Sequence, residues 1–319
     1  MKGLKPTTGA ILLTLTLPLA ANAELRSLNE TDMSSVTGQA GLTVEISDAQ
    51  ISIGEINYKD EGNIFIENTG LAGAGLIQAR RGLAVTEGNL LDNVKVTVDI
   101  AGDASDSAGL ESQWGLGKIT GAALALSSSS VGDHGESAVD ISDGDLVISI
   151  GAIDEADMVD FGAYTDRVSL GKSTMNAGEA ASNTGTVLMS NVMMSGFVGP
   201  IDIVVDGQEN TMNINSYLQA DGEMTLDFLS TSLDFAVHNR RGQDVLIFDN
   251  TATGESVSYF HAQADIGANA DPSKGLRFNL TDASGDMDFT NITLGSAPSI
   301  GHVYLTDVSM QADLNVYGH

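Results

Sequence analysis

The chain is long, strongly acidic and free of cysteine. It has 319 residues, and 43 Asp and Glu against 14 Lys and Arg give a formal net charge of −29 at pH 7. A surface of this sign repels nucleic acid and anionic lipid, and the lack of cysteine excludes disulfides, thiolate metal sites and cysteine nucleophiles. The length is sufficient for one large domain or two smaller ones with a buried core.

Residues 1–23 are predicted to be a secretory signal peptide. Lys2 and Lys5 precede a short apolar run over 10–17, and small residues follow up to Ala23. A charged region, an apolar core and an A-x-A site are typical of a cleaved leader, and about ten apolar residues are too few to span a bilayer. We expect cleavage after Ala23 and export through the general secretory route, to the periplasm, the outer-membrane surface or the medium.

Residues 24–41 are predicted to form a short helix followed by a glycine turn. Asn29 is a suitable N-cap, and Leu28 and Met33 give the helix an apolar side. Gly38 then begins a tight turn, because glycine adopts left-handed backbone conformations without steric cost. We expect this helix to cover an open end of the β-rich region that follows.

Residues 42–319 are predicted to be a β-rich domain, either single or divided into two subdomains near 175–185. Apolar residues alternate with polar ones in short runs, separated by spacers rich in Gly, Asn, Asp and Ser, which is typical of strands joined by turns. The clearest runs cover 42–46, 94–100, 146–150, 201–205 and 233–237. No segment after the leader offers 18 consecutive apolar residues, so we expect no transmembrane helix. The predicted fold class is all-β, an irregular elongated β-roll or β-sandwich with a short N-terminal helix.

One short pattern recurs six times in the β-rich region. Two apolar residues in alternation are followed by Ser, Thr or Glu and then by Asp or Asn, in copies that start at residues 44, 64, 139, 187, 278 and 303. The irregular spacing argues against a solenoid with a fixed repeat length. Because Asp and Asn side chains bond to their own backbone and tolerate bends, each copy is interpreted as a strand, a corner and a second strand.

The same corners have an alternative interpretation as calcium sites. Asp48, Asp143, Asp282 and Asp307 occupy the acidic position of four copies and supply the oxygen ligands that calcium prefers. The glycine-rich nonapeptide of calcium-binding rolls is absent from the sequence. The structural interpretation is therefore preferred, and the existence of a metal site is left open.

No arrangement typical of an enzyme is found in the sequence. The five histidines, at positions 134, 238, 261, 302 and 319, lie in separate segments, and no H-E-x-x-H, G-x-S-x-G or P-loop motif is present. Carboxylate pairs such as Asp140 with Asp143 and Asp286 with Asp288 would suit glycoside hydrolysis, but 43 acidic residues produce such pairs by chance. We predict no catalytic or cofactor-binding residue and a protein that is not an enzyme.

Two Arg-Arg-Gly triplets contain four of the few cationic residues. They lie at 80–82 and 240–242. We interpret them as turns whose arginines pair with nearby acids. A docking patch for an acidic partner is the alternative.

The segment after the leader resembles the opening of the FilA-like family of exported bacterial proteins, which are described as components of a pilus system. The residues that match are Leu28, Met33, Val36, Thr37, Gly38, Gln39, Ala40, Gly41 and Leu42. The resemblance extends from residue 25 to residue 42. It implies export and participation in a filament system, without catalytic residues.

These observations predict an exported structural or adhesive component of a pilus-like or cell-surface system. It would act by protein–protein contacts, with other pilus or surface proteins or with copies of itself, and would not bind nucleic acid. A calcium- or glycan-binding surface module is the main alternative. An outer-membrane β-barrel is a third, against which the aromatic content of 5% argues, because two aromatic girdles need more.

Overall fold

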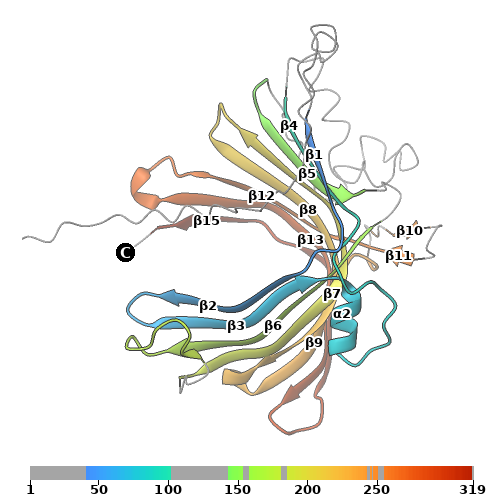
Figure 1. Ribbon diagram of the computed structural model, residues 1–319, viewed down its shortest axis with the longest axis vertical. Helices are drawn as coiled ribbons and strands as arrows, with labels where there is room; N and C mark the ends of the chain where they lie inside the picture. The colour runs from blue at the N-terminus through green and yellow to red at the C-terminus, as the bar shows by residue number, and fades with distance from the viewer. Residues whose placement is uncertain are drawn as a thin grey trace, which may run out of the picture. The chain divides into compact units, whose positions relative to one another are not determined.

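The protein is dominated by one large antiparallel sheet. The computed structural model describes residues 41–101, 143–153, 158–180, 185–242, 245, 247–250 and 255–317. Within these residues a sheet of 13 strands is accompanied by a two-stranded ribbon and one short α-helix (Figure 1). The predicted all-β class is confirmed, and the sheet is open rather than closed into a barrel. The predicted leader and N-terminal helix lie outside the described residues.

Three long strands divide the sheet into two halves, which we call half-sheet A and half-sheet B. The shared strands are β7 (Val187–Asp206), β8 (Thr211–Leu226) and β13 (Leu276–Leu294). Half-sheet A adds β1 (Leu42–Ile46), β4 (Val94–Ile100), β5 (Leu146–Ala152), β12 (Phe260–Ala268) and β15 (Ala312–Val316). Half-sheet B adds β2 (Ile51–Lys59), β3 (Asn63–Ala72), β6 (Val159–Gly171), β9 (Thr231–His238) and β14 (Gly301–Ser309).

Each half-sheet contains eight strands in antiparallel order. Half-sheet A runs β1-β4-β5-β7-β8-β12-β13-β15, and half-sheet B runs β2-β3-β6-β7-β8-β9-β13-β14. The remaining elements are α2 (Ala74–Arg80), the 3₁₀ turns η4 (Asp227–Leu229) and η5 (Pro272–Lys274), and the ribbon of β10 (Phe248–Asn250) with β11 (Glu255–Val257). No helix in the described part of the chain has the length and apolar character needed to cross a bilayer.

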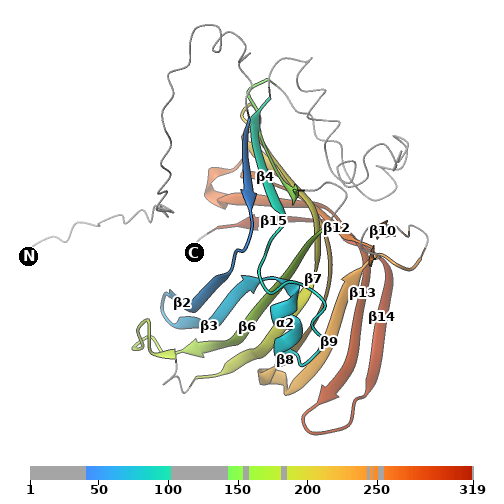
Figure 2. The same ribbon diagram turned by 45° about the vertical axis from the view of Figure 1, so that its right-hand side comes forward.

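The long strands bend where the two half-sheets meet. In β7 the pairing with β8 shifts between Val198 and Ile201, on either side of Gly199 and Pro200. Proline has no N–H to give to the ladder, so a local irregularity is expected there. In β13 the bend contains Gly285, whose φ of 142° and close approach to the His238 carbonyl leave no room for a side chain. The views of Figures 1 and 2 show the two half-sheets diverging from this line.

The sheet has one apolar and one polar face. Strand β8 alternates over most of its length, with residues such as Ile214 and Leu218 on one face and Asn215 and Gln219 on the other. Residues paired on neighbouring strands share a face, so the apolar face continues across the sheet. One such row is Ile148, Ile203, Ile214 and Ala264. Figure 1 shows α2 and the β10–β11 ribbon outside the bend, on the polar side. We call the apolar side the inner face and the polar side the outer face.

Burial is distributed in an unusual way between the two faces. On the outer face, Asp202 and Asn215 are 0% exposed and Gln263 is 1% exposed, whereas Ile203 and Ile214 on the inner face are only partly buried. Burying polar groups is costly unless they are hydrogen-bonded. The outer-face groups meet this condition, because Asp202 accepts a hydrogen bond from Ser149 and the other two belong to similar cross-strand networks.

The recurrent motif marks local bends, as predicted. Asp48, between β1 and β2, has a φ of 57°, and Asn68, Asn191 and Asp307 have φ values of 48°, 53° and 53°. Asp282 instead lies beside a register shift in the pairing of β12 and β13. The copy at 139 begins outside the described residues. Asp48 separates β1 from β2, as predicted. For the copies at 64, 187, 278 and 303 the division into two strands is wrong, because the strand continues through the bend.

Candidate functional site

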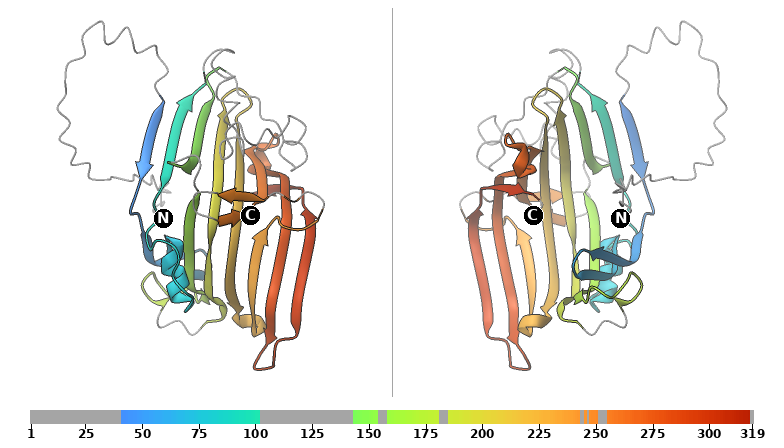
Figure 3. Two further views of the ribbon diagram at one scale, coloured as in Figure 1. Left: turned by 90° about the vertical axis from the view of Figure 1, so that its right-hand side faces the viewer. Right: turned by 90° about the vertical axis from the view of Figure 1, so that its left-hand side faces the viewer.

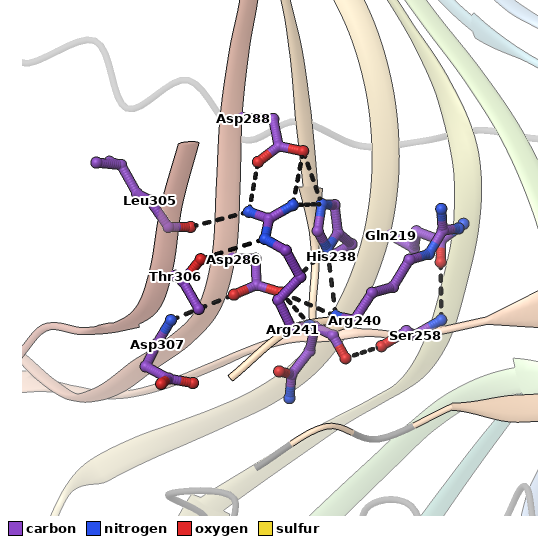
Figure 4. A network of polar contacts seen from close by, with 11 residues as sticks. Gln219, His238, Arg240, Arg241, Ser258, Asp286, Asp288, Leu305, Thr306 and Asp307 are labelled. Atoms are coloured by element: carbon purple, nitrogen blue, oxygen red, sulfur yellow. Dashed lines mark hydrogen bonds and ion pairs between the residues drawn. The ribbon is translucent and has the colours of Figure 1, made fainter. Parts of the chain in front are cut away.

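The densest polar cluster on the outer face is centred on Arg241, at the end of β9. Its guanidinium donates to both carboxylate oxygens of Asp288, over 2.6 and 3.0 Å, and its Nε donates to the Thr306 hydroxyl over 3.2 Å (Figure 4). His238 Nε2 lies 3.1 Å from the same carboxylate. The cluster therefore joins β9, β13 and β14 near the bend of the sheet.

Asp286 has a different role in this cluster, because it receives main-chain N–H groups. Its carboxylate is 0% exposed and accepts from the N–H groups of Arg240, Arg241 and Asp307, at 2.9, 2.7 and 3.2 Å. A carboxylate that satisfies three backbone donors fixes the path of both segments. Asp286 thus holds the 240–242 turn and β14 against β13.

The charges in the cluster shift two pKa values in opposite directions. Burial raises the pKa of Asp288, but the hydrogen bonds from Arg241 and His238 and their charges outweigh burial and hold it below the ordinary value of 3.8. The hydrogen bond to Asp288 correspondingly raises the pKa of Arg241. Both groups are therefore held in their charged forms at neutral pH.

A second cluster lies on the outer face of half-sheet A. His261 is 3% exposed, and its Nδ1 and Nε2 lie 2.6 Å from oxygens of Asp282 and Asn215. The Tyr217 ring lies over the imidazole, with 4.8 Å between the ring centroids. The Ser284 hydroxyl also donates to Asp282, over 2.7 Å. Asp282 therefore joins His261 and Ser284, which are paired across β12 and β13.

The two clusters contain three of the residues that the sequence suggested as a catalytic carboxylate pair or as calcium ligands. Asp286 and Asp288 are bound to the 240–242 turn and to Arg241, so hydrogen bonds within the fold already occupy both members of that pair. Asp282 is bound to His261. The described residues contain no group of three or more His, Cys, Asp or Glu arranged to hold a metal ion. Asp140 lies outside the described residues.

Both Arg-Arg-Gly triplets lie at turns, and Arg80, Arg81 and Arg241 pair with acids, as predicted. Arg80 contacts Asp166 over 2.5 Å, and Arg81 contacts Asp221 over 2.6 Å. Gly82 and Gly242 have positive φ values of 71° and 88°. In the second triplet Arg241 is paired with Asp288, as described above, and Arg240 is exposed.

In the described part of the chain, the two edges of the sheet are available for contact with another chain. Strands β1 and β2 form one edge and β14 and β15 form the other, which lies on the opposite side of the sheet in Figure 3. Among the described strands, none pairs with the outer side of these four. Their large apolar side chains are exposed, including Leu42 at 62%, Ile51 at 53%, Leu314 at 50% and Val316 at 60%.

Sequence reasoning found some of these groups and missed their association. The Arg241 triplet and the Asp286 and Asp288 pair both stand out in the sequence, but 47 residues separate Arg241 from Asp288 and no local pattern joins them. The exposed edges were not predicted, because alternation identifies strands without showing which strands lie outermost.

Comparison with known proteins reaches only the N-terminal part of the chain. No curated protein and no solved structure matches. The resemblance to the FilA-like family depends on residues 25–42. These residues lie inside the segment that matches a different family, whose description makes no reference to pili. Residues 1–102 are similar to a family of unknown function (DUF6160).

Proposed function

We propose that this protein is an exported structural component of a pilus-like or other cell-surface system, which acts by protein–protein contacts. The observation that carries the proposal is the pair of sheet edges with exposed apolar side chains. Natural proteins usually protect such edges, because unpaired main-chain groups pair readily with another chain. The predicted leader and the resemblance of residues 25–42 to exported pilus-system proteins support the same role.

The outer-face clusters favour a structural role over a catalytic one. Their carboxylates, imidazoles and guanidinium groups are bound to one another and to the main chain. Catalytic groups need access to a substrate and a reacting atom within reach. Arg241 and Asp288 instead join three strands, which stabilises the bend of the sheet.

Fractionation of the native host tests the proposal. Cells are sheared to release surface filaments, and the filaments, outer membrane, periplasm and cytoplasm are probed with antibody against the chain. Recovery in the sheared filaments supports the proposal. Recovery only in the detergent-extracted outer membrane, or only as soluble periplasmic protein, contradicts it.

A leader variant provides the control for this experiment. Ala23→Leu places a large residue at the predicted A-x-A cleavage site, where the signal peptidase requires a small one. The variant chain should keep its leader and disappear from the sheared fraction. An unchanged distribution would show that cleavage after Ala23 is not needed for the protein to reach the surface.

A further inference from the structure

The two edges of the sheet match each other in length. One edge consists of β1 with five residues and β2 with nine, and the other consists of β15 with five residues and β14 with nine. In both cases the five-residue strand belongs to half-sheet A and the nine-residue strand to half-sheet B. A second copy of this chain therefore offers each edge a strand of equal length in the corresponding half-sheet.

The strand directions also match. Every neighbouring pair in both half-sheets is antiparallel, and each half-sheet has an even number of strands, so its two outermost strands run in opposite directions. When β15 of one copy lies beside β1 of the next copy in the same orientation, the new pair is antiparallel. The same holds for β14 beside β2. Antiparallel addition preserves the hydrogen-bonding pattern of the sheet.

The two edges also present apolar side chains on the same face of the sheet. The register places Leu42 and Val44 of β1 on the inner face, together with Leu314 and Val316 of β15. In half-sheet B it places Ile51, Ile53, Val303 and Leu305 on the inner face. These eight side chains are 39–62% exposed. Pairing of the edges would bury them against one another, as apolar cross-strand pairs that favour association.

Proline and lysine, two of the devices that normally prevent such pairing, are scarce on these strands. None of the four contains proline, and the only lysine among them is Lys59 at the end of β2. Its ammonium group donates to the Met175 carbonyl over 2.7 Å and to the Asn176 side chain over 3.2 Å. Lys59 is therefore held toward the 172–180 segment of its own chain.

We propose that copies of this chain associate head to tail, with the β1–β2 edge of one copy pairing with the β14–β15 edge of the next. The contact is heterologous, so each added copy leaves one free edge at each end, and the assembly extends into a filament as long as the rotation between copies does not close a ring. The inference rests on the proposed structural role, to which it adds the partner and the strands that make the contact.

The test uses charged substitutions on the two edges of the chain, purified after expression with its own leader. Val44→Lys blocks the β1 edge and Leu314→Lys blocks the β15 edge, because an unpaired lysine on the inner side of the junction is costly to bury. Leu229→Lys is the matched control, since Leu229 is 56% exposed and lies in η4, away from both edges. Sedimentation velocity at about 0.5 M NaCl, where the screening length is about 4 Å, measures the size distribution.

Wild-type and Leu229→Lys chains should form species larger than dimers, and each edge variant alone should associate at least about tenfold more weakly. An equimolar mixture of the two edge variants should form heterodimers and nothing larger, because one intact edge of each kind remains. Circular dichroism checks that all chains are folded. A mixture that stays monomeric overturns the proposal, as does a Val44→Lys chain that still forms homodimers, which would indicate symmetric pairing.

The fractionation tests the surface role and the mixing experiment tests edge pairing, so either proposal can fail while the other holds. Heterodimers in the mixture, combined with a periplasmic location in the host, support edge pairing and contradict the surface role. Recovery in sheared filaments that is unchanged for both edge variants supports the surface role and overturns edge pairing.

Discussion

Asn191 adopts a left-handed conformation in the interior of β7, with a φ of 53°. A side chain with a Cβ costs about 1 kcal/mol there relative to glycine. The Asn191 amide also donates to Glu223 over 3.0 Å at the exposed surface, and both Asn191→Ala and Asn191→Gly remove this bond. Urea unfolding should therefore show Asn191→Ala to be the less stable variant by about 1 kcal/mol. Equal stabilities of the two variants would show that the backbone conformation contributes nothing.

Asp288 gives the fold a stability that depends on pH. Its folded-state pKa lies below the ordinary value of 3.8, so its contribution is present above about pH 4 and is lost as the pH falls through the folded pKa. We expect Asp288→Asn to lower the unfolding free energy at pH 7 by about 1–3 kcal/mol, because Arg241 and His238 lose their charged acceptor. Denaturant unfolding from pH 7 to pH 3 should show the wild type and the variant converging at the acidic end.

The matched control for this pH dependence is Asp313→Asn. Asp313 also has a lowered pKa, through its hydrogen bond with Arg277, but both side chains are about half exposed. Exposed ion pairs contribute little to stability, because water and salt screen them. If Asp313→Asn lowers the unfolding free energy as much as Asp288→Asn does, the greater burial of the Asp288–Arg241 pair does not make it more stabilising than the Asp313–Arg277 pair.

At the scale of elements, α2 is positioned by a glycine in the sheet. The side chain of Ile77 lies directly over Gly162 in β6, and a Cβ added at Gly162 would overlap Ile77 Cγ1. We expect Gly162→Ala to displace the helix and to destabilise the protein by about 1–3 kcal/mol. Gly151→Ala in β5 is the control, because nothing lies within 4 Å of the added Cβ. Equal melting temperatures of the Gly162→Ala and Gly151→Ala variants would show that the contact between Ile77 and Gly162 does not stabilise the protein.

The same helix shows why part of the fold could not be predicted. Alternation is a local property, so it identified β1, β4 and β5 correctly. For α2 the sequence offers Gly73 at the N-cap, without a capping side chain, and the first N–H, that of Ala74, is accepted by Asp160 over 2.9 Å. Asp160, which caps the helix, lies 86 residues from Ala74 in the sequence. Gly162, over which Ile77 packs, is also distant in the sequence, so no local pattern indicates either contact.

At the scale of the whole sheet, alternation predicted two faces but not which face would be buried. Apolar strand faces are ordinarily expected inside, yet here the outer face contains fully buried polar residues such as Asp202 and Asn215. Their burial depends on cross-strand hydrogen bonds that no single strand reveals. The Arg241 and Asp288 cluster has the same origin, since β9 and β13 become neighbours only in the folded sheet.

The net charge of −29 makes a prediction about the whole assembly. Copies of so acidic a chain repel one another over about 20 Å at 20 mM salt, and over about 4 Å at 0.5 M. Edge pairing by main-chain hydrogen bonds and apolar contacts should therefore strengthen as NaCl is raised, with larger species in sedimentation velocity. Association that weakens with salt would mean that charge pairs hold the copies together. Calcium and magnesium at equal ionic strength should act alike where carboxylates respond only to ionic strength, and a larger effect of calcium would support the calcium-binding alternative.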